Sequence, residues 1–140
     1  MKILLVYPQY PDTFWSFRHA LKFLFKKATF PPLGLLTVAA MLPKEWEKKL
    51  VDLNTTNLTD KDIKWADYVF ISAMVVQDNS AREVVDRCKK LGTKTVGGGP
   101  VFSVGYEEFG HEDVDHLISN EAEDLLPLFV EELEKGCANI

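Results

Sequence analysis

A run of three glycines closed by a proline, Gly97-Gly98-Gly99-Pro100, is the feature that most constrains the fold of this chain. The β-branched residues Thr95 and Val96 precede it, which indicates a buried strand leading into the glycines. Glycine lets the backbone turn with positive φ or approach another surface closely, and a proline cannot continue a strand. Two interpretations remain open: a tight turn from strand to helix, or a wall against which a flat ligand lies.

The rest of the chain alternates between expected strands and expected helices. Continuous apolar runs at residues 3–7 and 68–71 are typical of strands buried on both faces of a parallel sheet. Three further strands are expected at residues 49–53, 94–96 and 114–118. Apolar residues at helical spacing, with capping residues and prolines, predict helices at residues 12–27, 32–42, 60–65, 79–91 and 121–133, and one more short helix within 101–113.

This alternation predicts one α/β domain over residues 1–136 and a short tail at 137–140. The expected architecture is flavodoxin-like (Rossmann-like): a doubly wound, five-stranded parallel sheet in the order 2-1-3-4-5, with right-handed crossovers. Residues 8–30 form an insertion longer than the usual connection after a strand, and it could cap a site. Ligands of such sheets bind at the carboxyl ends of the strands. That edge is expected to gather Tyr7, Ser72, Met74, Gly97, Gly98, Ser119 and Glu121.

Composition and charge exclude several classes of protein. The net charge of −5 argues against a nucleic-acid partner, because phosphates require a basic surface. The apolar run after Met1 is too short for a signal peptide or a membrane span. Cys88 and Cys137 have neither metal-ligand nor disulfide spacing, so both are expected to be free thiols in a reducing compartment. These features together predict a cytoplasmic protein.

The residues at the expected strand ends do not match the most familiar users of this fold. A phosphate-accepting response regulator needs an aspartate after the third strand, where Ser72 stands, and an acidic pair after the first, where Tyr7 and Pro8 stand. The phosphate loop of a flavodoxin and the Gly-x-Gly-x-x-Gly of a dinucleotide domain are missing after the first strand, and no Gly-x-Ser-x-Gly nucleophile elbow occurs. No catalytic residue and no metal ligand is therefore assigned in this chain.

Six short stretches make the chain resemble the cobalamin-binding domain found at the N-terminus of many radical SAM enzymes, and the resemblance covers nearly the whole chain. They are Tyr7-Pro8, Phe30-Pro31-Pro32-Leu33-Gly34-Leu35-Leu36, Trp65-Ala66-Asp67, Ile71-Ser72-Ala73-Met74, Gly97-Gly98-Gly99-Pro100 and Asn120-Glu121-Ala122-Glu123. The last stretch is similar to a Gly-Glu-x-Glu segment of the family. The resemblance implies that the cofactor is cobalamin.

The resemblance also implies where the cofactor binds. In such domains the serine after the third strand and the glycines after the fourth line the groove that receives the nucleotide tail of cobalamin. The candidate cofactor-binding residues carried over in this way, with their neighbours, are Ser72, Ala73, Met74, Gly97, Gly98, Gly99 and Glu121. A small hydroxyl and backbone without side chains suit a ligand tail that lies deep between strand ends.

One departure from the family concerns the cobalt ligand. Cobalamin domains that replace the cofactor's own lower ligand use an Asp-x-His-x-x-Gly motif after the first strand. The nearest register here starts at Asp12 and puts Phe14 at the histidine position and Phe17 at the glycine position. The three histidines, His19, His111 and His116, are expected to be structural or exposed. The chain is therefore expected either to bind cobalamin without histidine ligation or to have lost cobalamin binding.

The second departure is a missing cysteine triad. A radical SAM enzyme holds its 4Fe-4S cluster through a Cys-x-x-x-Cys-x-x-Cys motif, which this chain lacks, so the cluster and S-adenosylmethionine are expected only in a separate radical SAM catalytic domain. This chain alone is then expected to be non-catalytic, with that domain as its partner. A homodimer through residues 12–27 is a further expectation. The alternative function is a cofactor-free interaction or lid domain.

Overall fold

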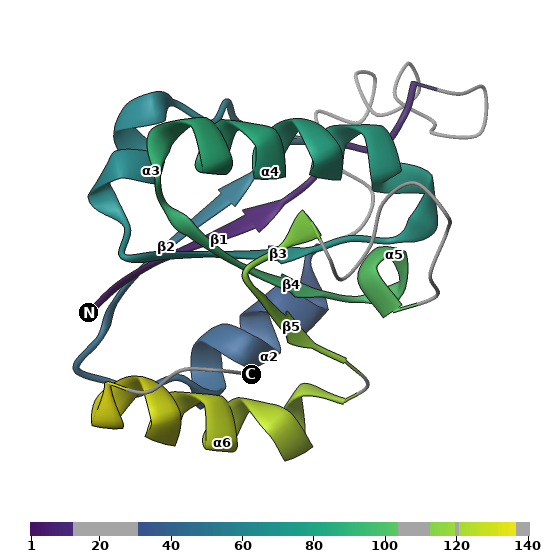
Figure 1. The fold of residues 1–140 in the computed structure, drawn as a ribbon. Helices are drawn as coiled ribbons and strands as arrows, with labels where there is room; N and C mark the ends of the chain where they lie inside the picture. Colours follow the sequence, from purple (N-terminus) through teal and green to yellow (C-terminus); the bar gives the residue numbers. More distant parts are fainter. Residues whose placement is uncertain (13–30, 104–112, 120, 137–140) are drawn as a thin grey trace.

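A five-stranded parallel sheet organises the computed structural model, which describes residues 1–12, 31–103, 113–119 and 121–136 (Figure 1). Its strands are β1 (Lys2–Tyr7), β2 (Glu47–Asp52), β3 (Tyr68–Ser72), β4 (Lys94–Gly98) and β5 (His116–Ile118). They lie in the order β2-β1-β3-β4-β5, and every neighbouring pair is parallel. The predicted flavodoxin-like order 2-1-3-4-5 is therefore confirmed.

Helices cover both faces of the sheet (Figure 1). The helices α3 (Asp60–Trp65), α4 (Asp78–Leu91) and the short α5 (Pro100–Ser103) pack on one face, whereas α2 (Leu33–Met41) and α6 (Ala122–Lys135) pack on the other. A 3-10 helix, η2 (Val75–Gln77), joins β3 to α4. Within the described part of the chain, no helix is long and apolar enough to cross a membrane.

The pleat of the inner strands explains why there are two cores. Successive side chains of a strand point to opposite faces of the sheet. In β1, Leu4 and Val6 therefore belong to the core under α3, α4 and α5, whereas Ile3 and Leu5 belong to the core under α2 and α6. All four side chains are buried. The continuous apolar run of β1 is thus the consequence of burial on both faces, as predicted.

Side-chain caps fix the ends of the helices on the first face. At the start of α3, the Thr59 backbone N–H donates to Asp62 Oδ2 (2.9 Å), and the Asp62 N–H donates to Thr59 Oγ1 (3.3 Å). This reciprocal pair is a capping box, which satisfies two backbone donors at the helix start. Helix α4 ends at Gly92, whose φ of +72° gives the left-handed conformation typical of this position. The predicted end of this helix at Gly92 is confirmed.

Three strands differ clearly from their predicted bounds. Strand β2 runs from Glu47 to Asp52 rather than over residues 49–53. Strand β4 does not stop before the glycines: Gly97 and Gly98 remain in the sheet and pair with Leu117 and Ile118. Strand β5 begins at His116 rather than at residue 114. The Asp115 carboxylate instead accepts hydrogen bonds from Thr95 N (2.7 Å) and Thr95 Oγ1 (2.8 Å). A side chain thus takes over the contact between the two strands just before β5 begins.

Several expectations fall on residues outside the described ranges. Most of the insertion at 8–30, the helix expected at 12–27 and the tail at 137–140 lie there. So do Phe14, Phe17, His19, His111 and Cys137. The short helix expected within 101–113 is represented by α5, which starts at Pro100.

Candidate functional site

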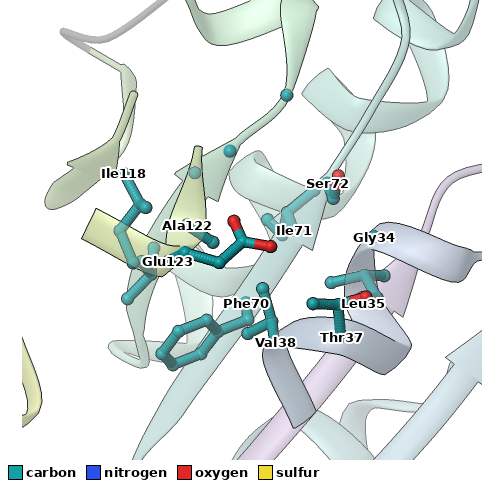
Figure 2. A pocket seen from close by; sticks show the side chains of 14 residues that line it. Gly34, Leu35, Thr37, Val38, Phe70, Ile71, Ser72, Ile118, Ala122 and Glu123 are labelled. Carbon is teal, nitrogen blue, oxygen red and sulfur yellow. The ribbon is translucent and has the colours of Figure 1, made fainter. Parts of the chain in front are cut away.

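A pocket of about 270 Å³ lies between α2 and α6, above the carboxyl-terminal halves of β3, β4 and β5 (Figure 2). The sheet forms its floor, and the two helices form its sides. The residues that line it are Gly34, Leu35, Thr37, Val38, Phe70, Ile71, Ser72, Val96, Gly97, Gly98, Gly99, Ile118, Ala122 and Glu123.

The register of the sheet explains why the floor is hollow. Ser72, Gly98 and Ile118 stand side by side in one row across three strands, and Phe70 and Val96 stand in the row below them. Residues two apart in a strand share a face, so both rows face the pocket. The lower row is filled by large apolar side chains, whereas a hydroxymethyl group and a hydrogen occupy two places of the upper row. Space for a ligand therefore opens at the carboxyl end of the sheet.

The three glycines have three different roles. A Cβ on Gly97 would stand 3.0 Å from Val114 Cγ2 and 3.1 Å from the Phe102 ring, both of which pack on the face away from the pocket. A Cβ on Gly98 would meet only the Ile118 carbonyl oxygen, at 3.5 Å, and would otherwise project on the pocket side. Only Gly98, therefore, keeps the pocket open by lacking a side chain.

Gly99 makes the tight turn that ends β4. Its φ is +88°, and a Cβ there would lie 2.8 Å from the carbonyl oxygen of Ala73. The turn is bonded to the end of β3, because Ala73 N donates to Gly98 O and Val101 N donates to Ala73 O, both at 3.2 Å. Both sequence interpretations of the glycine run thus apply, to different residues: Gly99 forms a turn and Gly98 forms a wall.

The structure brings only some of the candidate residues together. Ser72, Gly97, Gly98 and Gly99 line the pocket. Ala73 is buried in the core on the other face, and Met74 is 47% exposed at the start of η2. Glu121 occupies the N-cap position of α6 without a side-chain capping bond and is exposed outside the pocket. These last three residues do not line the pocket.

One side of the pocket and its charged residue were not among the candidate cofactor-binding residues predicted from the sequence. The missed side is the first half of α2, represented by Gly34, Leu35, Thr37 and Val38. The charged residue is Glu123, which ends the Asn120-Glu121-Ala122-Glu123 stretch of the resemblance but was not among the candidate cofactor-binding residues. The composition of α2 was a usable signal, because Leu-Gly-Leu-Leu-Thr-Val-Ala-Ala-Met has no charged face. A helix that is apolar all round needs contacts on more than one side.

The segment after β1 is fixed by hydrogen bonds at the same edge of the sheet. The Pro8 carbonyl accepts hydrogen bonds from Gln77 Nε2 (2.5 Å) and Asn54 Nδ2 (3.2 Å), and Tyr10 N donates to Asn54 Oδ1 (2.9 Å). The Tyr7 and Tyr10 hydroxyls are 2.7 Å apart. Burial, with the hydrogen bond to Tyr10, raises the pKa of Tyr7 well above its usual range. The segment after β1 is thus held at the carboxyl edge by side chains from two other loops.

Two further reactive side chains of the described residues are packed in the core. Cys88 is fully buried, and burial raises the pKa of its thiol to about 12, so it is not a thiolate near neutral pH. His116 packs against Phe129, with ring centroids 5.2 Å apart. In the described ranges, no three His, Cys, Asp or Glu side chains gather as metal ligands.

The polar groups of the pocket can hold a ligand by hydrogen bonds, and its floor can hold an apolar ring.

Comparisons with known proteins identify the family to which this fold belongs. A model of the B12 binding domain matches residues 27–130. An uncharacterized methyltransferase of Synechocystis sp. is 45% identical over 136 residues, which are 97% of this chain and 25% of the relative. The hopanoid C-2 methylase of Rhodopseudomonas palustris is 35% identical over 117 residues, which are 83% of this chain and 22% of the relative. The chain thus spans about a quarter of the length of these relatives.

Proposed function

Because the chain belongs to the B12-binding domain family, we propose that it is the cobalamin-binding domain of a larger methyl-transferring enzyme. The pocket between α2 and α6 carries this proposal, since it lies at the carboxyl ends of the strands, where ligands of doubly wound sheets bind. The names of the two relatives, a methyltransferase and a methylase, support the class of reaction.

The apolar floor of the pocket fits the nucleotide tail of cobalamin, which ends in a flat, largely apolar base. Phe70, Val96 and Ile118 offer an apolar surface of suitable character. Gly98 leaves a space that a side chain would fill, and the Ser72 hydroxyl offers one hydrogen-bonding group beside it. We assign the tail to these residues rather than to Ala73, Met74 or Glu121.

The chain's own contribution is to bind, orient and shield. When bound, cobalamin supplies a cobalt centre that carries the group to be transferred. The hydrogen bonds from Gln77 and Asn54 to Pro8 hold the carboxyl edge in one arrangement. Met74 and Val76, which are 47% and 61% exposed, give that edge an apolar surface that excludes water once it is covered.

The catalytic partner is proposed to be a radical SAM domain elsewhere in the larger protein. The support is the family resemblance of the six sequence stretches, together with the fact that the relatives are about four times as long as the matched segment. S-adenosylmethionine and a 4Fe-4S cluster would then belong to that domain. A Cys-x-x-x-Cys-x-x-Cys motif in the same protein is the expected sequence signature.

The second candidate function is a cofactor-free interaction or lid domain. The exposed apolar side chains Leu33 and Leu36 of α2 favour it, because they form a surface that a partner could cover. Such a partner would be the catalytic domain or a second copy of the chain bound through residues 12–27. No corrinoid would bind in either case, and light scattering would show a dimer if the partner is a second copy.

Binding of hydroxocobalamin, compared with the tailless corrinoid cobinamide, tests the proposed function. We expect hydroxocobalamin to bind with 1:1 stoichiometry and at least about tenfold more tightly than cobinamide, because only the former places a base in the pocket. Equilibrium dialysis followed by absorbance gives both dissociation constants. Equal affinities would contradict the assignment of the pocket, and no binding of either would favour the cofactor-free alternative.

A further inference from the structure

Glu123 is the one charged side chain among the described residues that line the pocket. It stands in the first turn of α6, and Figure 2 shows its carboxylate extending over the pocket from the Ile118 side toward Ile71 and Ser72. Glu123 is exposed, and no hydrogen bond or ion pair with another described residue engages its carboxylate. A carboxylate therefore faces an otherwise largely apolar floor.

The position of Glu123 at a helix start does not by itself explain its direction. Acidic residues in a first turn stabilise a helix through its dipole, and Asp124 serves that purpose in the same turn without lining the pocket. Glu121, which precedes the helix, is likewise outside the pocket. Glu123 thus differs from its acidic neighbours in what it faces, and Asp124 is a matched control for its charge.

The chemistry of a carboxylate determines which ligand it favours. An ionised carboxylate is an acceptor only, so it needs a donor when a ligand removes its water. The dimethylbenzimidazole base of cobalamin carries two methyl groups and, when neutral, no N–H. Adenine carries an exocyclic amino group with two N–H donors. A base of the first kind would desolvate Glu123 without compensation, whereas one of the second kind would bond to it.

We propose that Glu123 makes this pocket selective for cobamides whose nucleotide base carries an amino group, such as adenine, over cobalamin itself. The proposal rests on the proposed function, because it assumes that the nucleotide tail enters the pocket. The Ser72 hydroxyl at the end of β3 also lines the pocket and adds a donor for a ring nitrogen of the same base. Sites built to hydrogen-bond a polar group discriminate strongly against an analogue without it.

Dissociation constants for three corrinoids test the proposal: cobinamide, hydroxocobalamin and the corresponding adenine cobamide. They are measured by equilibrium dialysis for the wild-type protein and for Glu123→Gln, Glu123→Leu and the control Asp124→Asn, each checked for folding by circular dichroism. We expect the wild type to bind the adenine cobamide at least about tenfold more tightly than hydroxocobalamin. Asp124→Asn should keep this ratio.

The variants at Glu123 should change the ratio rather than abolish binding. Glu123→Gln retains one acceptor and should lower the preference, and Glu123→Leu should remove it while binding hydroxocobalamin as tightly as the wild type or more tightly. If Glu123→Leu does not fold, Glu123→Gln carries the test. Equal wild-type affinities for the two complete cobamides, or an unchanged ratio in the Glu123 variants, would overturn the proposal alone. Failure to bind any corrinoid, or cobinamide binding as tightly as both, would overturn the proposed function with it.

Discussion

Gly97 and Gly98 are adjacent residues of one strand, yet they face opposite sides of the sheet. The hydrogen of Gly97 points toward Phe102 and Val114, so its smallness serves the core. The hydrogen of Gly98 points toward the pocket, so its smallness keeps that side of the pocket open. Substitutions at the two positions should consequently fail in different ways.

Gly98→Val should weaken cobalamin binding by roughly 10- to 100-fold, because two methyl groups would occupy the space between Ser72 and Ile118. The fold should persist, since a Cβ at Gly98 makes an ordinary contact at 3.5 Å. Equilibrium dialysis gives the affinity, and circular dichroism reports the fold. An affinity equal to that of the wild type would place the tail elsewhere.

Gly97→Ala is the matched control on the same strand. Its Cβ would press on Phe102 and Val114 at 3.0–3.1 Å, which should lower the free energy of unfolding by about 1–3 kcal/mol. The folded fraction should still bind cobalamin, because the new methyl group lies away from the pocket. Loss of binding in fully folded Gly97→Ala protein would contradict the separation of the two faces.

At the scale of elements, the start of α3 shows how strongly a short helix depends on its cap. Asp62 accepts from the Thr59 N–H and forms an ion pair with Lys49 of β2. The hydrogen bond from Lys49, followed by those from Thr59, lowers the pKa of Asp62 to about 2. One carboxylate therefore holds the helix start and ties it to the edge strand.

Asp62→Asn should destabilise the protein by about 1 kcal/mol at pH 7, because the ion pair is lost and the cap is weakened. The folded pKa of about 2 lies below the unfolded value of about 4. The contribution of Asp62 is therefore complete above about pH 4 and disappears as the pH falls through about 2. Urea unfolding at pH 7 and pH 2 measures the difference.

Glu83→Gln is the control for this prediction, since Glu83 is an exposed residue on the outer side of α4. It should change the free energy of unfolding by less than about 0.5 kcal/mol at either pH. A difference between wild type and Asp62→Asn that stays constant from pH 7 to pH 2 would show that the charge of Asp62 contributes nothing.

Helix α2 illustrates what a local pattern leaves undetermined. Its apolar residues and the preceding Pro32 predicted a helix that packs on the sheet, and Leu35 does so. The apolar composition of α2 indicated contacts on more than one side, but it could not identify them as a pocket wall, because α6 on the opposite side follows more than 80 residues later. A site wall formed by two distant helices is a tertiary property.

For the molecule as a whole, the sheet was the most predictable part. Two continuous apolar runs, β1 and β3, marked strands buried on both faces, and their alternation with helices restricted the topology to a doubly wound sheet. The bounds of β4 and β5 were less predictable. Pairing of Gly97 and Gly98 with β5, and the contact of Asp115 with Thr95, arise from neighbours that are distant in sequence.

The pocket was predictable at its floor and not at its rim. Ser72 and Gly98 end strands that could be recognised, and Gly99 follows one, so their place at the carboxyl edge followed from the topology. Met74 and Glu121 were expected there too, but Met74 turns into η2 and Glu121 occupies the N-cap position of α6 outside the pocket. The direction of a side chain after a strand depends on the next turn, which the sequence pattern does not determine.

The central claim is that cobalamin binds with its nucleotide tail in the pocket between α2 and α6, and that no histidine of this chain replaces the tail at the cobalt. Electron paramagnetic resonance of the cob(II)alamin form, bound to ¹⁵N-labelled protein, tests both parts in one spectrum. The measurement detects whether a nitrogen nucleus is coupled to the cobalt, and the label identifies its source.

We predict a spectrum without nitrogen splitting, because the proposal places the cofactor's own base in the pocket and Phe14 stands at the histidine position of the family motif. A nitrogen splitting that does not change with the label would mean that the base remains on the cobalt and the pocket is not its site. A splitting that changes with the label would mean that a residue of the protein, such as His19, is the ligand.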